Sequence, residues 1–159
     1  MLPNMRLKHA LIATCLVALA STTSFAQENK GFEPIYGSLK ADEVNVRSGP
    51  GTQYPILVVY RYRGYPVQAI AQYDTWYKIR DVEGEEGWIY RGFFSRQHTV
   101  MVSAGEPITL HKDSQGKHPL LRLEQGVIAP LDGCEGNACR IELNNYKGWV
   151  DKGRLLMVE

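Results

Sequence analysis

Residues 44–51 read Val44–Asn45–Val46–Arg47–Ser48–Gly49–Pro50–Gly51, and this stretch decides the fold class of the 159-residue chain. In a β-strand Val44 and Val46 share one face, which we expect to point into a core, while Asn45 and Arg47 point outward. Residues 48–51 combine two glycines with a proline, a composition typical of a sharp loop. The stretch therefore predicts a short strand that is buried on one face and ends in a tight turn.

Short apolar or alternating runs continue after this strand, and turn-forming residues at 63–64, 74–75 and 83–84 separate them. The runs are Ile56–Tyr60, Tyr65–Ala71, Trp76–Arg80 and Gly87–Tyr90. Helical apolar periodicity is hard to find from Gly37 onward. Five short strands within about 55 residues predict a small β-barrel or β-sandwich.

The second half of the chain repeats this pattern in weaker form. Tyr54–Leu57 matches His118–Leu121 at an offset of 64 residues, and Gly87–Trp88–Ile89 matches Gly148–Trp149–Val150 at an offset of 61. The shrinking offset indicates that turns lose residues while the strands are kept. We therefore predict two units, at 39–96 and 97–159, preceded by an N-terminal segment at 27–38. The join at Ser95–Thr99 is short, so the units are expected to lie against each other.

The first 26 residues have the pattern of a cleaved signal peptide. Arg6 and Lys8 precede the uncharged apolar run Ala10–Ala20, and small residues at Ser24 and Ala26 favour cleavage after Ala26. The apolar run is about half of what a membrane-spanning helix needs. A lipoprotein anchor at Cys15 is the alternative, which the preceding Thr14 disfavours. We predict a periplasmic or secreted protein with no membrane span in the mature chain.

Composition excludes two classes of protein, disordered chains and basic nucleic-acid binders. The chain is 44% hydrophobic and 22% charged, which is ordinary for a globular protein and unlike a disordered one. Its 18 Lys and Arg nearly balance its 17 Asp and Glu, for a net charge of +1. No basic excess points to nucleic acid as a partner.

Two cysteines remain after the signal peptide, Cys134 and Cys139. An even number of cysteines in an exported chain favours a disulfide, and Gly136–Asn137 between them suits a hairpin turn. A redox-active pair and a zinc site are the alternatives. The first normally has closer spacing at a helix start, and the second needs two more ligands.

The stretch Val44–Gly51, together with Trp76–Tyr77–Lys78–Ile79 and Gly87–Trp88–Ile89, resembles the bacterial SH3-like (SH3b) domain over residues 39–96. Residues 99–157 resemble the second repeat of tandem SH3-like proteins exported by Gram-negative bacteria. There, Ile108–Asp113 lacks the glycine-rich turn, and Ala138 stands where an aromatic residue is expected. The resemblance implies an all-β chain of two small SH3-like β-barrels in tandem, and a module that targets the cell wall without catalysis.

Catalytic patterns are scarce, so we predict no enzyme, no cofactor and no metal site. Both mature cysteines are assigned to the disulfide, no nucleophile elbow of the G-x-S-x-G type occurs, and His98, His111 and His118 are widely separated. We interpret these histidines as surface or turn residues. The acidic residues Asp81, Glu83, Glu85 and Glu86 are interpreted as a solvated turn, with a metal site as the alternative.

Aromatic residues are more numerous in the first unit than so small a core can bury. We expect the ligand-binding residues to be Tyr54, Trp76, Arg80, Trp88 and Tyr90, with Arg61, Arg63 and Arg91 flanking them. Rings beside cations suit stacking on sugars or packing on peptides, and the cations suit carboxylates. We predict peptidoglycan (stem peptide or glycan) or an envelope protein as the ligand. The alternative is a structural or interaction subunit whose aromatic surface is covered by the second unit or a protein partner.

Overall fold

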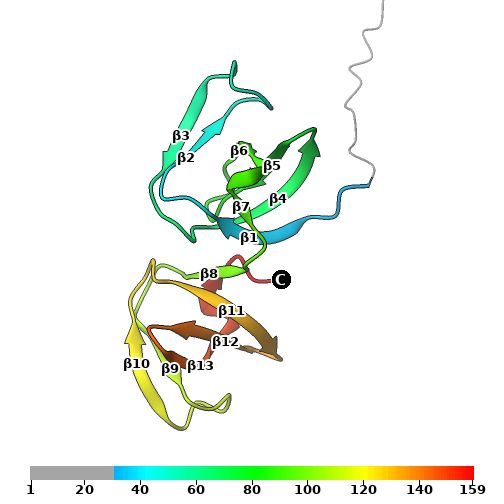
Figure 1. Cartoon of the computed structure of the whole chain (residues 1–159). Coiled ribbons are helices and arrows are strands. Elements are labelled where there is room, and N and C mark those ends of the chain that lie inside the picture. Colours follow the sequence, from blue (N-terminus) through cyan, green and yellow to red (C-terminus); the bar gives the residue numbers. More distant parts are fainter. Residues whose placement is uncertain (1–30) are drawn as a thin grey trace, which may run out of the picture.

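The computed structural model describes residues 31–159, which form two β-sheet units, one above the other in Figure 1. The predicted signal peptide, its cleavage after Ala26 and the alternative at Cys15 lie outside the described residues. Between residues 31 and 159, no helix is long and apolar enough to cross a membrane. The predicted all-β, SH3-like fold is confirmed.

The first unit is a seven-stranded antiparallel sheet in the order β3-β2-β6-β5-β4-β1-β7. A short 3₁₀ helix, Arg91–Phe93, precedes its last strand. The strands are β1 (Ile35–Leu39), β2 (Val44–Arg47), β3 (Ile56–Tyr60), β4 (Pro66–Tyr73), β5 (Trp76–Arg80), β6 (Glu86–Tyr90) and β7 (Phe94–Ser95).

The second unit has the equivalent order, β10-β9-β13-β12-β11-β8-β14. Its 3₁₀ helix, Lys152–Arg154, again precedes the last strand. The strands are β8 (Thr99–Val102), β9 (Ile108–His111), β10 (Pro119–Leu123), β11 (Ile128–Glu135), β12 (Ala138–Leu143), β13 (Tyr146–Asp151) and β14 (Leu155–Leu156).

Both units have a β-bulge in the equivalent strand pair, β2–β3 in the first and β9–β10 in the second. In the first, Val46 is opposite Val58 and Arg47 is opposite Ile56, so Leu57 is the extra residue. In the second, Leu110 is opposite Leu121 and His111 is opposite Pro119, so the extra residue is Leu120. A bulge of this kind bends an edge strand and increases its twist. The two sheets therefore agree in detailed register as well as in strand order.

Each unit has a separate hydrophobic core, built by alternation along its strands. Val44, Val46 and Ile89 are buried in the first core, as the sequence pattern predicts. The second core is organised around Leu110, Ile141 and other residues of β8, β9, β12 and β13. Two cores make each unit a compact body with its own apolar centre.

Two strands of the first unit were not predicted, β1 and β7. Strand β1 crosses the predicted boundary between the N-terminal segment 27–38 and the unit 39–96, and it lies between β4 and β7. Strand β4 is displaced from the predicted run Tyr65–Ala71. It begins one residue later, at Pro66, and continues two residues further, to Tyr73.

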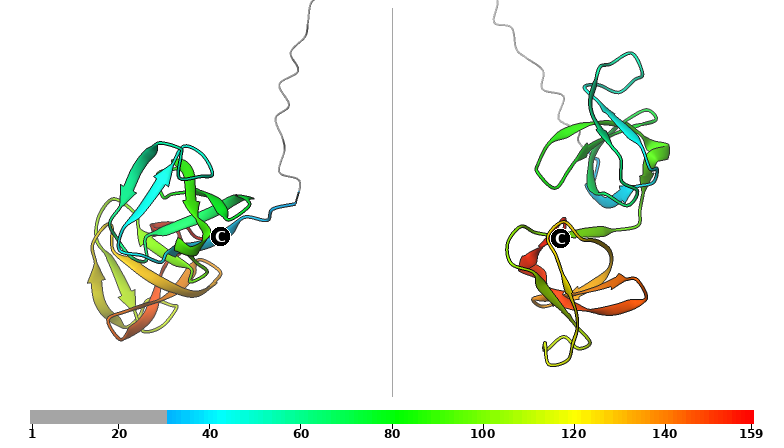
Figure 2. Two further views of the ribbon diagram at one scale, coloured as in Figure 1. Left: turned by 45° about the horizontal axis from the view of Figure 1, so that its top comes forward. Right: turned by 90° about the vertical axis from the view of Figure 1, so that its left-hand side faces the viewer.

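The two units touch through the start of the second, where β8 contacts β1 and β4 (Figure 2). The Thr99 hydroxyl donates a hydrogen bond to the carbonyl of Gly64 at 2.8 Å, and the ring of His98 stacks on Tyr36 at 5.0 Å. The Ser38 hydroxyl donates to the carbonyl of Gln97 at 2.8 Å. These contacts hold the short connection between the units against the first sheet.

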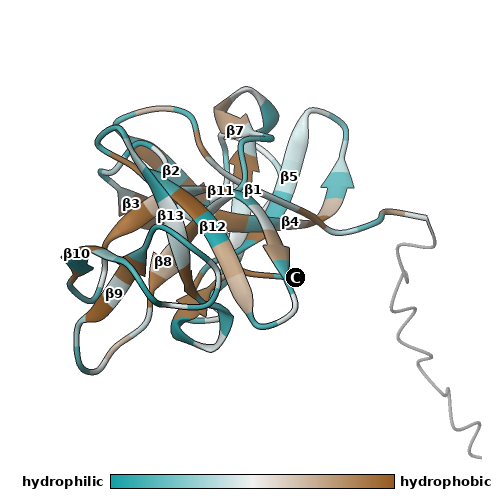
Figure 3. Cartoon of the chain, turned by 90° about the horizontal axis from the view of Figure 1, so that it is seen from below, coloured by the Kyte–Doolittle hydropathy of each residue, from teal (hydrophilic) through white to brown (hydrophobic). Residues whose placement is uncertain are grey.

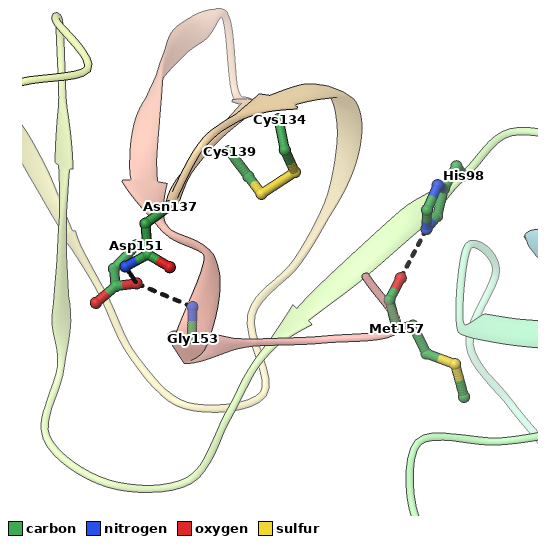
Figure 4. The surroundings of a disulfide bond; sticks show 7 residues. All are labelled: His98, Cys134, Asn137, Cys139, Asp151, Gly153 and Met157. Carbon is green, nitrogen blue, oxygen red and sulfur yellow. Dashed lines mark hydrogen bonds between the residues drawn. A yellow bond between two sulfur atoms is a disulfide. The ribbon is translucent and has the colours of Figure 1, made fainter. Parts of the chain in front are cut away.

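The structure contains the disulfide between Cys134 and Cys139, which stand opposite each other at the end of the β11–β12 hairpin (Figure 4). Beside it, the Asn137 amide donates to the Asp151 carboxylate at 3.1 Å, and the same carboxylate accepts the Gly153 N–H at 2.9 Å. These bonds join the disulfide-linked hairpin to the C-terminal 3₁₀ turn.

Candidate functional site

The outer side of β5 and β6 gathers most of the residues predicted to bind a ligand. Three cross-strand pairs occupy it, because β5 and β6 bury alternate residues such as Ile79 and Ile89 and turn the others outward. The pairs are Trp76 with Tyr90, Lys78 with Trp88, and Arg80 with Glu86. We call these six side chains the β5–β6 face.

Aromatic rings form a row along one end of the β5–β6 face. The rings of Trp76 and Tyr90 are 6.3 Å apart and nearly perpendicular, and Tyr90 makes a similar edge contact with Phe93 at 5.9 Å. Tyr90 is 47% exposed, so the row is open to solvent. Rings fixed edge to face in this way offer a rigid apolar surface.

Charged groups occupy the other end of the face. The Glu86 carboxylate accepts hydrogen bonds from Lys78 and from Arg80, whose Nη2 is 2.6 Å from Oε1. These two donors hold the pKa of Glu86 below its ordinary value. Two cations share one carboxylate, which leaves the cluster with one excess positive charge.

Tyr54 lies in the loop that follows β2, next to the face. Its ring packs on Gly49, where a Cβ would lie 2.5 Å from the Tyr54 ring, so this loop position has no room for a larger residue. Arg47 stands opposite Trp88 in the sheet, and its guanidinium donates to the carbonyls of Thr52 and Tyr54 at 3.1 and 2.7 Å. Arg47 therefore fixes the loop beside the β5–β6 face.

Most of the expected flanking arginines are already paired. Arg61 pairs with Glu43, and Arg63 pairs with Asp42, both at 3.1 Å, in the loops between β1 and β2 and between β3 and β4. Neither loop belongs to strand β5 or β6, so neither contributes a side chain to the β5–β6 face. Arg91 has no ion pair within residues 31–159. Sequence spacing alone did not reveal these partners.

The interpretation of the acidic residues as a solvated turn is wrong for Asp81. Its side chain is only 5% exposed, and its carboxylate accepts the N–H groups of Glu83 and Glu85, both at 2.9 Å, and the hydroxyl of Tyr60. Burial, and then this hydrogen bond, raise the pKa of Tyr60 above its ordinary value. Asp81 is thus a structural residue that orders the β5–β6 turn. In the described part of the chain, no three His, Cys, Asp or Glu residues are grouped as metal ligands.

The three histidines have different environments, and His111 is the last residue of strand β9 and half-buried, not in a turn. His98 lies between the units, where its Nε2 is 2.6 Å from the carbonyl of Met157 (Figure 4). His118 is an exposed loop residue whose Nδ1 is 2.8 Å from Asp113, as expected for a turn histidine. Asp113 also accepts backbone N–H bonds from its own loop, and these, with His118, lower its pKa to about 2. His98 lies in the connection between the units, and Asp113 and His118 lie between β9 and β10, so none of them belongs to the β5–β6 face.

Comparison with known proteins supports the fold of the first unit. The family model described as bacterial SH3 domain matches residues 40–95, close to the predicted 39–96. Among curated proteins, none matches the chain.

Solved structures similar to this chain include NlpC1 and NlpC2 from Trichomonas vaginalis. NlpC1 is 16% identical, with a TM-score of 0.37 over 89% of this chain and 50% of that protein. NlpC2 is 15% identical, with a TM-score of 0.36 over 77% of this chain and 48% of that protein. The chain therefore spans about half the length of either protein.

Proposed function

Because residues 40–95 form a bacterial SH3 domain, we propose that this chain is an exported, non-catalytic protein that binds peptidoglycan or an envelope protein through the β5–β6 face. The observation that carries the proposal is the exposed row of rings, Trp76, Tyr90 and Phe93, beside the cluster of Lys78, Arg80 and Glu86.

The chemistry of the face suits the chemistry of a cell-wall fragment. Aromatic rings stack on the apolar faces of sugars and pack against peptide side chains. The excess positive charge beside Glu86 would attract a carboxylate, and the Arg80 guanidinium can present two N–H groups to it. Peptidoglycan carries sugars and carboxylates close together.

Two further observations favour an exported protein without catalysis. A disulfide between Cys134 and Cys139 is typical of proteins in an oxidising compartment, in agreement with the signal-like N-terminus. The same bond leaves no free thiol within residues 31–159 that could act as a nucleophile.

An envelope protein is the second candidate ligand, because Tyr90 and Phe93 form an exposed apolar surface of the kind that partners cover. The second unit contacts the first through β1, β4 and the Gly64 carbonyl. The β5–β6 face is on other strands, so a separate protein would have to cover it.

The test is retention of the mature protein, residues 27–159, on purified peptidoglycan. We expect Trp88→Ala to lower retention at least about fivefold, since an aromatic contact contributes about 1 kcal/mol. Trp149→Ala is the matched control, because Trp149 is opposite Arg140 on β13 as Trp88 is opposite Lys78 on β6. Circular dichroism would verify that both variants fold.

Equal loss of retention in both variants would refute binding through the β5–β6 face. If no variant and no wild-type protein is retained, peptidoglycan is not the ligand. Crosslinking from Tyr90 in cells then tests for a stoichiometric protein partner. Release of new products from muropeptides incubated with the protein would refute the non-catalytic role.

A further inference from the structure

Strand β3 is the edge of the first sheet, and its free side faces no other strand within residues 31–159. Its sequence, Ile56–Leu57–Val58–Val59–Tyr60, has no charged residue, and Figure 3 colours the strand largely brown, as hydrophobic. Ile56, Leu57 and Val58 are 46%, 58% and 41% exposed. Edge strands are normally protected by charges or coverage, so an open apolar edge indicates a binding surface.

A cavity opens beside this edge because the core face of the sheet is not filled there. Val58 stands opposite the buried Val46 and so belongs to the core face, yet it remains exposed. The cavity has a volume of about 170 Å³, and Leu57, Val58, Tyr60 and Ile79 contribute to its wall. In the second unit the equivalent Leu121 packs against the core instead.

One carboxylate without an ion pair in the described residues, that of Glu85, lies on the rim of the cavity. Glu85 and Glu86 lie on it, and Glu86 is already paired with Lys78 and Arg80. Glu83 and Glu85 make no ion pair in the described part of the chain. Burial, and then the charges of Asp81 and Glu83, raise the pKa of Tyr65 to about 12. The Tyr65 ring lies 4.6 Å from the ring of Tyr60, the last residue of β3.

We propose that β3 binds an extended peptide as an added strand, with one apolar side chain in the cavity and a lysine or arginine side chain beside Glu85. An added strand would use the free backbone groups of the edge, and its alternate side chains would reach the cavity. A cavity of about 150 Å³ holds a benzene-sized group, so this one accepts a branched aliphatic or small aromatic side chain.

Glu85 favours this occupant over a second copy of the chain. A two-fold pairing of β3 with β3 would bring the uncharged residues 56–60 of the partner copy to the edge. The cations that follow them, Arg61 and Arg63, are already paired with Glu43 and Asp42, so such a pairing would supply no unpaired cation to Glu85. The β3 edge shares only Glu86 with the β5–β6 face, and the proposal does not depend on the function proposed for that face.

The experiment uses two synthetic nonapeptides and the ¹⁵N-labelled mature protein. Both peptides alternate threonine and valine, and they end in two lysines or in two glutamates. With the lysine peptide we expect backbone amide shifts concentrated on residues 56–60. The glutamate peptide should bind more weakly, by about two- to fivefold, because one partly exposed ion pair contributes at most about 1 kcal/mol.

Variants test the two halves of the site separately. Glu85→Gln should remove the preference for the lysine peptide, and Leu57→Thr should weaken both peptides. The matched control is Leu120→Thr, at the equivalent bulge of the second unit, which should change neither. Trp88→Ala should also bind normally, which separates this result from the test of the β5–β6 face.

Three outcomes would overturn the proposal: equal affinity for the two peptides, amide shifts confined to residues outside β3 and the β5–β6 turn, or no binding at millimolar peptide. A concentration-dependent dimer that Leu57→Thr abolishes would also overturn it, because the occupant of the edge would then be a second copy.

Discussion

Gly87 stands where the first sheet has no room for a side chain, so Gly87→Ala is a direct test of the structure. A Cβ at this position would lie 2.3 Å from Cγ1 of Val46 and 3.1 Å from the carbonyl oxygen of Arg47. Val46 is buried, and its β-branched side chain has little rotational freedom with which to avoid the contact. Strands β2 and β6 would therefore have to move apart at the centre of the sheet.

The cost follows from the size of this overlap. Overpacking of a well-packed core by one methyl group destabilises a protein by about 1–3 kcal/mol. For a unit of this size, a loss of about 2 kcal/mol lowers Tm by roughly 8–16 °C. The related Gly148→Ala should cost as much or more, since its Cβ would meet the His111 carbonyl oxygen at 2.5 Å.

The assay is urea unfolding followed by tryptophan fluorescence in a Trp149→Phe background, so that only Trp76 and Trp88 of the first unit report. Gly148→Ala and the control Gly153→Ala lie in the second unit, so their unfolding is followed by Trp149 in a Trp76→Phe, Trp88→Phe background. A Cβ at Gly153 would have no neighbour closer than 3.5 Å, and Gly153→Ala should destabilise its unit by less than about 0.5 kcal/mol. Addition of Val46→Ala to Gly87→Ala should cost less than the sum of the two changes. If Gly87→Ala destabilises the first unit no more than Gly153→Ala destabilises the second, the packing described for β2 and β6 is refuted.

Three other changes test the remaining structural assignments. Tyr60→Phe removes a donor from the buried Asp81 carboxylate and should destabilise the first unit by about 1–3 kcal/mol at pH 7, measured by urea unfolding. Burial raises the pKa of Tyr60 and of Tyr65 above the unfolded value of 10. The contribution of these two side chains to the free energy of unfolding is therefore fully present below pH 10. Stability should therefore fall as the pH rises above 10, and less steeply in Tyr60→Phe, whereas a flat profile from pH 9 to 12 would contradict the assignment. Reduction of the Cys134–Cys139 disulfide should destabilise the second unit by about 2 kcal/mol and leave the first unit unchanged, as two unfolding transitions monitored separately would show.

Most of the strands that could be predicted have alternating burial, whereas β3 was predicted from a continuous apolar run. Val44 and Val46 alternate with Asn45 and Arg47, and the structure buries the valines as predicted. Strand β1 was missed because its residues include Gly37 and Ser38, which have low strand propensity. Strand β7 was missed because two residues carry no periodic signal. Both depend on pairing partners far away in the sequence.

The sequence predicts which side chains of the candidate site point outward, but it does not predict which of them pair with each other. Alternation around Ile79 and Ile89 places Trp76, Trp88 and Tyr90 outward, and the structure agrees. The pairing of Arg80 with Glu86 depends on the register of the β5–β6 hairpin, which the sequence does not specify to one residue. Asp81 was misjudged because acidic residues in a hairpin are usually solvated, and its backbone donors become visible only in three dimensions.

The equivalent face of the second unit shows why we assign the proposed binding surface to the first. Trp149 is again opposite a cation, Arg140, so the tryptophan and its cross-strand partner are present in both units. However, Ala138 and Asp151 stand opposite each other where the first unit has the Trp76–Tyr90 ring pair.

The charges of the two faces also differ. At the position of Arg80 and Glu86 the second unit has Glu142 and Lys147, and Lys147 pairs with both Glu142, at 2.9 Å, and Asp132, at 3.5 Å. Over the six equivalent positions, Arg140 and Lys147 balance Glu142 and Asp151, so the second face has no net charge where the first has an excess positive one. A carboxylate ligand would therefore be attracted more strongly by the first face, and only the first offers a row of rings.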